Sequence, residues 1–542
     1  MIIESVSQPA ANRLAGDYQQ GKPEAMQFFH YHPYQIESYR ARLQWLKSNP
    51  CLHRKRLVDG LLTYNRAIGN HPAALERIEQ LNGPDAYVVI GGQQAGVLTG
   101  PLYTIHKAVH LLQTARKLQE ELQVAVVPVF WIAGEDHDLA EIDHVYGLTE
   151  GETAVSKWRM DLSRKRRFSA SSLSLNCEEA ARFVDSVLHE WTETEETAAI
   201  RDLLKQAARQ SATVADWFAR LMATLFGKHG LVLVESSLPF VRELEQPVFR
   251  QVIERNEQIS ALLEEASARI VAAGYKPQLE VDGKQANLFV YENGERLLLE
   301  RHDGRFRTKD RCRTYSKAEL VAMVEEDPSQ FSANVVSRPL MQEHLFPTLA
   351  FIGGQGEVAY WAFYRQIFAA MGYQLPIVLP RMSVTLVEGA IARQMLQVGV
   401  TVETVLTRFD DWRVQWERRQ APDPLKERFE QTRQAMEALY RPLVTAVAER
   451  DAGLRDLAEK NLHLLLGQVT FLEERLDRSL RHREDVVQTR VKRLEASLRP
   501  EGVWQERKLS FFYFANKYGL DLADRLVCAP FNLDGRHQIV YL

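Results

Sequence analysis

Five short apolar runs, separated by helical patterns, constrain the fold of this 542-residue chain more than any other feature. The runs do not alternate polar with apolar residues, which is typical of strands buried on both faces of a parallel sheet. Strands that alternate with helices form doubly wound α/β sheets, so we predict a Rossmann-like core of about five parallel strands. The expected strands are Tyr87–Ile90, Val124–Ile132, Leu231–Val234, Thr348–Ile352 and Leu375–Leu379, with helices such as Leu102–Leu122 and Thr213–Phe226 between them.

The core is expected to carry insertions, because the third and fourth strands are too far apart for one crossover. We place these insertions at about residues 150–230 and 235–335. In the second, Asp-Gly or Asn-Gly pairs at 282–283, 293–294 and 303–304 separate strand-like runs. Such pairs suit type I′ hairpin turns because they tolerate positive φ, so we predict a small antiparallel sheet over 277–308. The basic run Arg164–Arg167 is expected to be a solvated loop, with a phosphate contact as the alternative.

Residues 1 to about 85 are expected to be mostly helical, and their aromatic cluster Phe28–Tyr34 is expected to pack one helix against the core. Between about 424 and 498, apolar residues recur at steps of three and four, with a break near Gly453. This pattern is typical of an antiparallel helical hairpin or coiled coil. We therefore divide the chain into a catalytic core (1–385), a helical region with this arm (386–500) and a C-terminal segment that packs on the core (501–542). The arm has an apolar seam to bury, so we expect a homodimer, with an arm folded back on its own core as the alternative.

Composition limits the class of function. The formal net charge is -4 and the 67 Lys and Arg residues are spread along the chain, which excludes a dedicated nucleic-acid binder. Four widely spaced cysteines show no zinc-binding spacing and indicate reduced thiols. No signal peptide and no apolar run long enough for a membrane span is evident. We expect a cytoplasmic enzyme that acts on small molecules, without nucleic-acid or membrane partners.

Two glycine-rich turns mark the expected site, because ligands of open α/β sheets bind beyond the carboxyl ends of the strands. The turn after the first strand is neither a dinucleotide fingerprint, since Gln93 replaces a required glycine, nor a P-loop, since Val97 replaces its lysine. A second such turn follows the fourth strand, and Arg338 precedes it, where it could pair with a carboxylate. The expected substrate-binding residues are Gly91, Gly92, Gln93, Gln94, Arg338, Gly353, Gly354, Gly356, Glu357 and Tyr360.

An acidic run, Glu135, Asp136, His137 and Asp138, follows the second strand. Carboxylates and an imidazole at this density can bind an ammonium, act as a general base or hold a metal. The alternative is that Asp136 only caps a helix, but capping does not require three carboxylates and a histidine. We expect these four residues to be catalytic, and we predict no tightly bound metal.

Two segments resemble the nucleotide-binding motifs of class I aminoacyl-tRNA synthetases. The tetrad Tyr103–His106, after Thr99 and Gly100, resembles their His-Ile-Gly-His motif but has lost the glycine, and Arg381–Thr385 resembles their Lys-Met-Ser-Lys-Ser loop. The resemblance implies an adenylyl-transfer scaffold with altered ligand handling that uses ATP with Mg²⁺. The residues implied in nucleotide binding are Thr99, Gly100, Tyr103, His106, Arg381, Met382 and Ser383, with His106 also catalytic.

The chain as a whole resembles the bacillithiol biosynthesis cysteine-adding enzyme family. The resemblance rests on Tyr31–Tyr34, Gly91–Lys107, Val129–Tyr146, Ser337–Trp361 and Leu379–Ser383. It implies a cysteine ligase that joins L-cysteine to glucosaminyl-malate through an amide bond, the last step of bacillithiol synthesis. It also implies a Rossmann-like core with connecting insertions and a dimerising coiled coil. The alternatives are another adenylate-forming amino-acid ligase or nucleotidyl transferase on this scaffold, and a non-catalytic coiled-coil partner protein.

Overall fold

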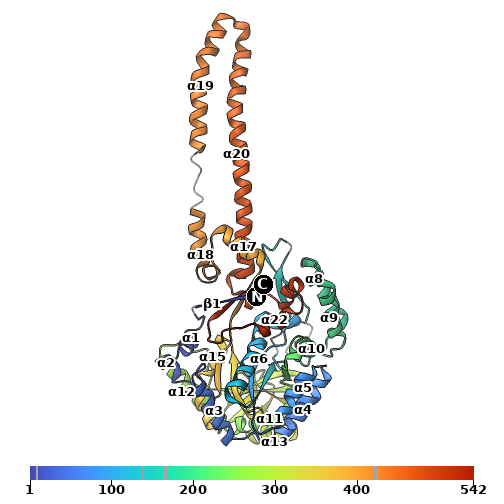
Figure 1. Ribbon diagram of the computed structural model, residues 1–542. Helices are drawn as coiled ribbons and strands as arrows, with labels where there is room; N and C mark the ends of the chain where they lie inside the picture. Colours follow the sequence, from blue (N-terminus) through green and yellow to red (C-terminus); the bar gives the residue numbers. More distant parts are fainter. Residues whose placement is uncertain (8–9, 137, 150, 163–168, 419–424) are drawn as a thin grey trace. The chain divides into compact units, whose positions relative to one another are not determined.

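The computed structural model describes residues 1–7, 10–136, 138–149, 151–162, 169–418 and 425–542 (Figure 1). The chain divides into two compact units, one formed by Met1–Gly389 with Pro500–Leu542 and the other by Ala390–Arg499. Among the described helices, none is both long enough and apolar enough to cross a membrane.

The first unit is built on a five-stranded parallel sheet, as predicted. Its order is β13-β12-β2-β3-β6, so the chain builds outward from β2 on one side and then returns to add β12 and β13 on the other. The direction of winding therefore reverses between β2 and β12, which is the switch point where such sheets bind ligands. The strands are β2 (Ala86–Gln93), β3 (Ala125–Ile132), β6 (Val232–Glu235), β12 (Thr348–Gly353) and β13 (Ile377–Pro380).

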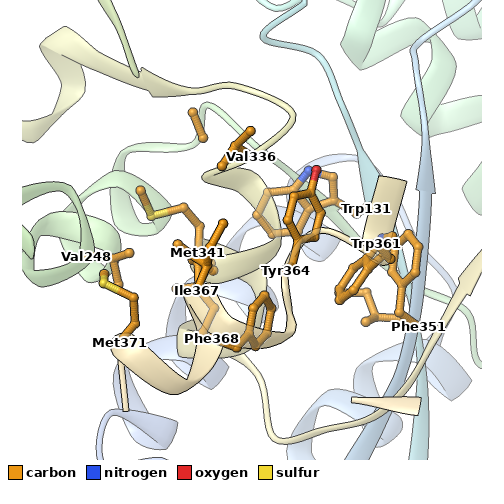
Figure 2. Packing of buried hydrophobic residues seen from close by; sticks show 14 of the residues in the cluster. Trp131, Val248, Val336, Met341, Phe351, Trp361, Tyr364, Ile367, Phe368 and Met371 are labelled. Atoms are coloured by element: carbon orange, nitrogen blue, oxygen red, sulfur yellow. The ribbon is translucent and has the colours of Figure 1, made fainter. Parts of the chain in front are cut away.

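Large apolar side chains fix the helices that follow the switch-point strands. The long helix α6 (Tyr103–Leu122) packs against β2 and β3. The short helix α15 (Gln355–Trp361) is held by Trp361, whose ring stacks on Phe351 of β12 at a centroid distance of 4.5 Å (Figure 2). Burial of each such side chain stabilises the fold by about 1.5–3 kcal/mol. The turn between β12 and α15 is thus anchored on both sides.

The N-terminal segment is largely helical, as predicted, but it opens with a strand that was not predicted. Strand β1 (Ile2–Val6) pairs with the last strand, β15 (His537–Tyr541), and β15 also pairs with β14 (Val384–Val387). The aromatic cluster packs as expected, since Phe29 is buried and stacks on Tyr18 at 3.8 Å. The helices are α1 (Arg13–Gln19), α2 (Pro23–Met26), α3 (Ile36–Ser48), α4 (Arg54–Ala67) and α5 (Pro72–Gln80), and α21 (Phe511–Tyr518) and α22 (Leu522–Cys528) precede β15.

The insertion between β3 and β6 begins with a short helix and a hairpin and continues with three longer helices. Its elements are α7 (Leu139–Ile142), β4 (His144–Leu148), β5 (Val155–Arg159), α8 (Cys177–Glu190), α9 (Thr197–Arg209) and α10 (Val214–Phe226). The basic run Arg164–Arg167 lies outside the described residues.

The insertion between β6 and β12 contains a five-stranded antiparallel sheet, which is larger than the predicted one. Two of the three turn pairs form hairpins with positive φ at both residues, Asn293-Gly294 (50° and 81°) and Asp303-Gly304 (49° and 73°). The prediction of a third hairpin at 282–283 was wrong, because no strand precedes that turn. The elements are α11 (Pro239–Glu254), α12 (Asn256–Ala272), β7 (Gln285–Glu292), β8 (Glu295–His302), β9 (Arg305–Thr308), β10 (Thr314–Tyr315), α13 (Lys317–Glu326), β11 (Phe331–Ala333) and α14 (Arg338–Leu345).

The second unit is helical and contains the predicted antiparallel hairpin (Figure 1). Helices α19 (Leu425–Arg450) and α20 (Arg455–Leu498) run side by side and are joined by a 3₁₀ turn at Ala452–Leu454. The 44 residues of α20 span about 66 Å. Polar pairs such as Arg441–Glu459 at 3.0 Å cross between the two helices. Helices α17 (Gly389–Val398) and α18 (Val402–Arg418) precede the hairpin.

Candidate active site

A cavity of about 400 Å³ lies at the carboxyl ends of β2 and β12, which is the switch point of the sheet. Its volume is in the range of small-molecule sites. Both glycine-rich turns reach it, as do parts of the acidic run and of the synthetase-like segments. The predicted site residues that line it are Gly92, Gln93, Gln94, Tyr103, Asp136, Arg338, Gly354, Gly356, Glu357, Tyr360 and Arg381.

The first two glycines of the β2 turn belong to the strand itself. Gly91 and Gly92 pair with Phe130 and Trp131 in the parallel ladder. A Cβ atom on Gly91 would lie 2.7 Å from the carbonyl oxygen of Ile352, and one on Gly92 would clash with that of Trp131. Glycine is needed here because neighbouring strands approach closely. Gly91 does not line the cavity, and neither does Gly353, which ends β12.

Lys107 joins the two turns, and sequence reasoning missed it. Its buried ammonium donates to the carbonyl oxygen of Gly92 at 2.6 Å and to Oε2 of Glu357 at 2.7 Å. The same carboxylate oxygen accepts the backbone N–H of Gly354 at 2.7 Å and closes the first turn of α15. Burial lowers the pKa of Lys107, and the ion pair with Glu357 offsets part of that effect. One signal was present in the sequence: Lys107 follows Tyr103 by four residues, so both lie on one face of α6.

Arg338 places a fixed positive charge in the cavity. It starts α14, and its Nη2 donates to the hydroxyl of Tyr360 at 3.2 Å. Burial alone would lower its pKa, but Tyr360, Asp136 and Glu357 raise it above the ordinary value. Arginine is the side chain best shaped to hold a carboxylate through two parallel hydrogen bonds. The structure places Arg338 at the lining of the cavity, and its role in binding an anion stays a prediction.

The acidic run after β3 separates in space. Asp136 lines the cavity with its side chain 34% exposed, and it lies 3.4 Å from Nε2 of Gln94 and 3.5 Å from Nη1 of Arg296. Glu135 is buried away from the cavity and forms an ion pair with Arg242. Burial alone would raise the pKa of Glu135, but Arg242 and Arg296 outweigh that effect and lower it.

The residues that follow Asp136 also differ in whether they line the cavity. Asp138 is exposed at the start of α7 and does not line the cavity, and His137 lies outside the described residues. Glu141, on the same short helix, does line the cavity. The expectation that Glu135, Asp136 and Asp138 form one catalytic cluster is therefore wrong, because consecutive residues at the end of a strand point in different directions. Of the described carboxylates in this region, Asp136 and Glu141 line the cavity. Across the described residues, no three or more His, Cys, Asp and Glu side chains are grouped to hold a metal ion.

Three of the seven residues expected to bind a nucleotide, His106, Arg381 and Ser383, contact a buried carboxylate. Glu506, which the sequence analysis missed, accepts two hydrogen bonds from Arg381 at 2.6 and 2.9 Å and one from Ser383 at 2.8 Å. Nδ1 of His106 lies 3.1 Å from the same carboxylate. Burial alone would raise the pKa of Glu506, but Arg381 and His106 hold it well below its usual range.

Of the seven residues assigned to the nucleotide, Tyr103 and Arg381 line the cavity, and the guanidinium of Arg381 is already paired. Met382 donates its N–H to Nδ1 of His110 at 3.1 Å, away from the cavity. Thr99 and Gly100 have positive φ, 65° and 67°, and form a tight turn before α6. Burial lowers the pKa of His106, with Glu506 acting against it. His106 is thus placed to position Glu506 and Arg381, and it does not reach the cavity.

Comparison with known proteins covers the whole chain. The model of the N-terminal Rossmann-like domain of bacillithiol biosynthesis BshC matches residues 1–382, and that of its C-terminal coiled-coil domain matches residues 384–542. The chain belongs to the BshC family. Relatives named "Putative cysteine ligase BshC" include one from Geobacillus kaustophilus (strain HTA426), 36% identical over 545 residues, and one from Bacillus cereus (strain AH187), 37% identical over 544 residues. In both cases the alignment covers 100% of the two chains.

In this BshC-family chain the cavity draws on both matched regions. Arg507 lines it from the C-terminal part, next to Glu506, which holds Arg381 in place. The cavity thus combines the cations Lys107, Arg338, Arg381 and Arg507 with accessible carboxylates such as Asp136. Such a mixture suits small molecules that carry both carboxylate and ammonium groups. The C-terminal sequence alone gave no signal for Arg507, because it follows no apolar strand and no motif.

Proposed function

We propose that the chain is a cysteine ligase that joins the carboxyl group of L-cysteine to the amine of glucosaminyl-malate, the last step of bacillithiol biosynthesis. Membership of the BshC family and full-length relatives named as cysteine ligases support the proposal. The observation that carries it is the cavity at the switch point, which brings the fixed cation of Arg338 and the accessible carboxylate of Asp136 into one small site.

The proposed acceptor has groups that match this cavity. Glucosaminyl-malate carries two carboxylates and one amine. Arg338 would hold one malate carboxylate through paired hydrogen bonds, and the exposed Arg507 is available for the other. Asp136 would hold the ammonium and then accept the proton that the amine must lose before it can attack a carbonyl carbon. Glu141 is a second carboxylate within the same cavity.

Amide formation from a free carboxylate and an amine is uphill in water, so the cysteine carboxyl group must be activated. We propose ATP with Mg²⁺ as the activating co-substrate, which when bound would transfer its adenylyl group to the cysteine carboxylate and release pyrophosphate, so that AMP can leave from the carbonyl carbon when the amine attacks it. The residues fit this role in part. Tyr103 and Arg381 lie at the cavity, whereas Thr99, Gly100, His106, Met382 and Ser383 do not. Lys107 and Arg507 are further cavity cations that can contact an anionic donor.

The test is to incubate the purified chain with glucosaminyl-malate, L-cysteine, ATP and Mg²⁺ under reducing conditions and to detect the ligated thiol by mass spectrometry. We expect product only in the presence of ATP. Product formed without ATP would contradict only the proposal that ATP is the co-substrate. The absence of product from folded protein would contradict the proposal that the chain is a cysteine ligase. The Asp136→Asn variant is expected to lose ligation, while Asp59→Asn, a change to an exposed carboxylate on α4, keeps it. Cysteine-dependent exchange of pyrophosphate into ATP, compared with other amino acids, would separate this function from another amino-acid ligase.

We also propose that the chain forms a homodimer through the hairpin of α19 and α20, and that it works in the cytoplasm. Large apolar side chains on both helices are exposed, such as Leu439 at 82% and Leu457 at 62%. Exposed apolar seams on paired helices are usually buried by a partner. The four cysteines are all free thiols, which agrees with a reducing compartment.

A further inference from the structure

A second cavity, of about 470 Å³, lies in the first unit and shares no lining residue with the candidate active site. It is bounded by the segment Pro33–Tyr39, by the second half of α6 and by the loop 532–534 near the C-terminus. Its volume is again in the range of small-molecule sites. The aromatic segment that contributes Tyr34 was singled out in the sequence, and nothing in the proposed ligase reaction uses it.

The cavity has an apolar floor. The rings of Tyr34 and Tyr39 line it together with the buried side chains of Leu118 on α6 and Leu379 on β13. The hydroxyl of Tyr39 is used within the protein, since it donates to the carbonyl oxygen of Pro33 at 2.8 Å. These surfaces suit an aliphatic or aromatic group of a ligand.

Two hydroxyls at the cavity are left without partners. The buried hydroxyl oxygens of Tyr34 and Thr114 make no hydrogen bond to any described residue. Thr114, on α6, is 3% exposed as a residue and lines the cavity. Buried polar atoms in proteins are nearly always hydrogen-bonded, so two unsatisfied hydroxyls beside one cavity mark positions where a ligand can donate or accept.

The charged residues that line the cavity are mainly acidic. Glu37, Glu121 and Asp534 supply three carboxylates, and Lys117 is the one cation among the lining residues. Lys117 lies 3.9 Å from Glu121, and Asp534 pairs with Arg536, which is not a lining residue, at 2.7 Å. Glu37 is exposed. With both of these pairs counted, the carboxylates still exceed the cations by one, which favours a cation over an anion such as a phosphate or a carboxylate.

From this cavity, its unsatisfied hydroxyls and its acidic rim, we propose that the chain has a second binding site for a small organic amine. The ammonium group lies among Glu37, Glu121 and Asp534, and the apolar body of the ligand rests on Tyr34, Tyr39 and Leu118. A hydroxyl on that body bonds to Thr114. The site shares no lining residue with the ligase cavity, which contains cations such as Arg338 and Arg507 together with carboxylates such as Asp136.

Calorimetry on the full chain with tyramine as the probe tests the proposal. Tyramine carries an ammonium and a hydroxyl on an aromatic body, and 3-(4-hydroxyphenyl)propionate is its anionic counterpart. We expect tyramine to bind at least tenfold more tightly than the propionate. The double variant Glu37→Gln/Glu121→Gln is expected to raise the Kd for tyramine by about threefold or more, which is the range expected for the loss of exposed ion pairs. Glu24→Gln, a change to an exposed carboxylate on α2, leaves the affinity unchanged.

Two further variants separate this site from the ligase cavity. Thr114→Val keeps the shape of the side chain and removes its hydroxyl, and it is expected to weaken tyramine while thermal unfolding stays near that of the parent chain. Asp136→Asn, in the ligase cavity, should not change tyramine binding. Equal affinity for tyramine and the propionate, or loss of tyramine binding in Asp136→Asn with the Glu37→Gln/Glu121→Gln variant unaffected, would overturn the proposal. Neither outcome depends on whether the chain is a ligase.

Discussion

Replacement of Glu506 by glutamine tests the buried network that joins the C-terminal segment to the core. Glu506 is 1% exposed and accepts hydrogen bonds from Arg381, Ser383 and the backbone N–H of Val384. Glutamine keeps the shape of the side chain but removes the charge that compensates the buried guanidinium of Arg381. Breaking one partner of a buried ion pair costs about 3–5 kcal/mol. We expect the lower end, about 3 kcal/mol, because the amide oxygen still accepts one of the hydrogen bonds.

Urea unfolding at pH 7, followed by tryptophan fluorescence and circular dichroism, measures this loss. The matched control is Glu501→Gln, which removes an ion pair with Lys508 at 2.6 Å in which the carboxylate is 57% exposed. Exposed pairs contribute less than about 1 kcal/mol, so the control should stay near the parent chain. Glu506 has a pKa below that of the unfolded chain, so its contribution is present above about pH 4.5 and is lost as the pH falls through the folded pKa. Equal stability of Glu506→Gln and Glu501→Gln at pH 7 would refute the reasoning.

Three other predictions follow from the same structure. Gly92→Ala is expected to destabilise the chain by about 1–3 kcal/mol in thermal unfolding, because its Cβ would press on the carbonyl of Trp131, whereas Gly356→Ala, with open space at Cβ, should be near neutral. Arg242 pairs with both Glu135 and Glu245, and burial raises the pKa of Glu245 to about 8, with Arg242 acting against it. Stability therefore falls as the pH rises from the unfolded pKa of Glu245 towards 8, because the unfolded chain releases this proton first. Above pH 8 the folded chain holds an ionised Glu245 at full cost, so Glu245→Gln should be less destabilising than Glu135→Gln in urea at pH 9, and the reverse order would contradict this assignment. The double variant Leu439→Glu/Leu457→Glu should shift the chain from dimer to monomer in analytical ultracentrifugation, whereas the control Leu52→Glu, at another exposed leucine, should remain a dimer. If the double variant and the control are both dimers, the hairpin is not the interface.

The parallel sheet could be predicted because its strands are buried on both faces, which leaves short apolar runs that are hard to mistake. The position of the site followed from the same argument, since the residues after β2 and β12 must meet at one edge. Strand β1 could not be found in this way. It is half-exposed, and its partner β15 lies at the other end of the chain, so no local pattern records the pairing.

Within the site, the direction of individual side chains was the part that the sequence could not provide. Glu135 and Asp136 are consecutive, yet one pairs with Arg242 inside the protein and the other lines the cavity. His106 and Arg381 were linked by their resemblance to synthetase motifs, and they do lie close together. Glu506, which occupies the space between them, comes from a segment with no motif of its own, so its role depends on tertiary contacts alone.

Steady-state ligation by Arg338→Gln tests the central claim most directly, namely that the switch-point cavity binds the carboxylates of the acceptor. A charged hydrogen bond contributes about 1.5–3 kcal/mol, so the KM for glucosaminyl-malate should rise by about tenfold or more while the KM for L-cysteine changes little. The control is Arg56→Gln, a change to an exposed arginine that pairs with Glu243, and neither of these residues lines the cavity. An Arg338→Gln variant with the same KM for glucosaminyl-malate as Arg56→Gln would contradict the account.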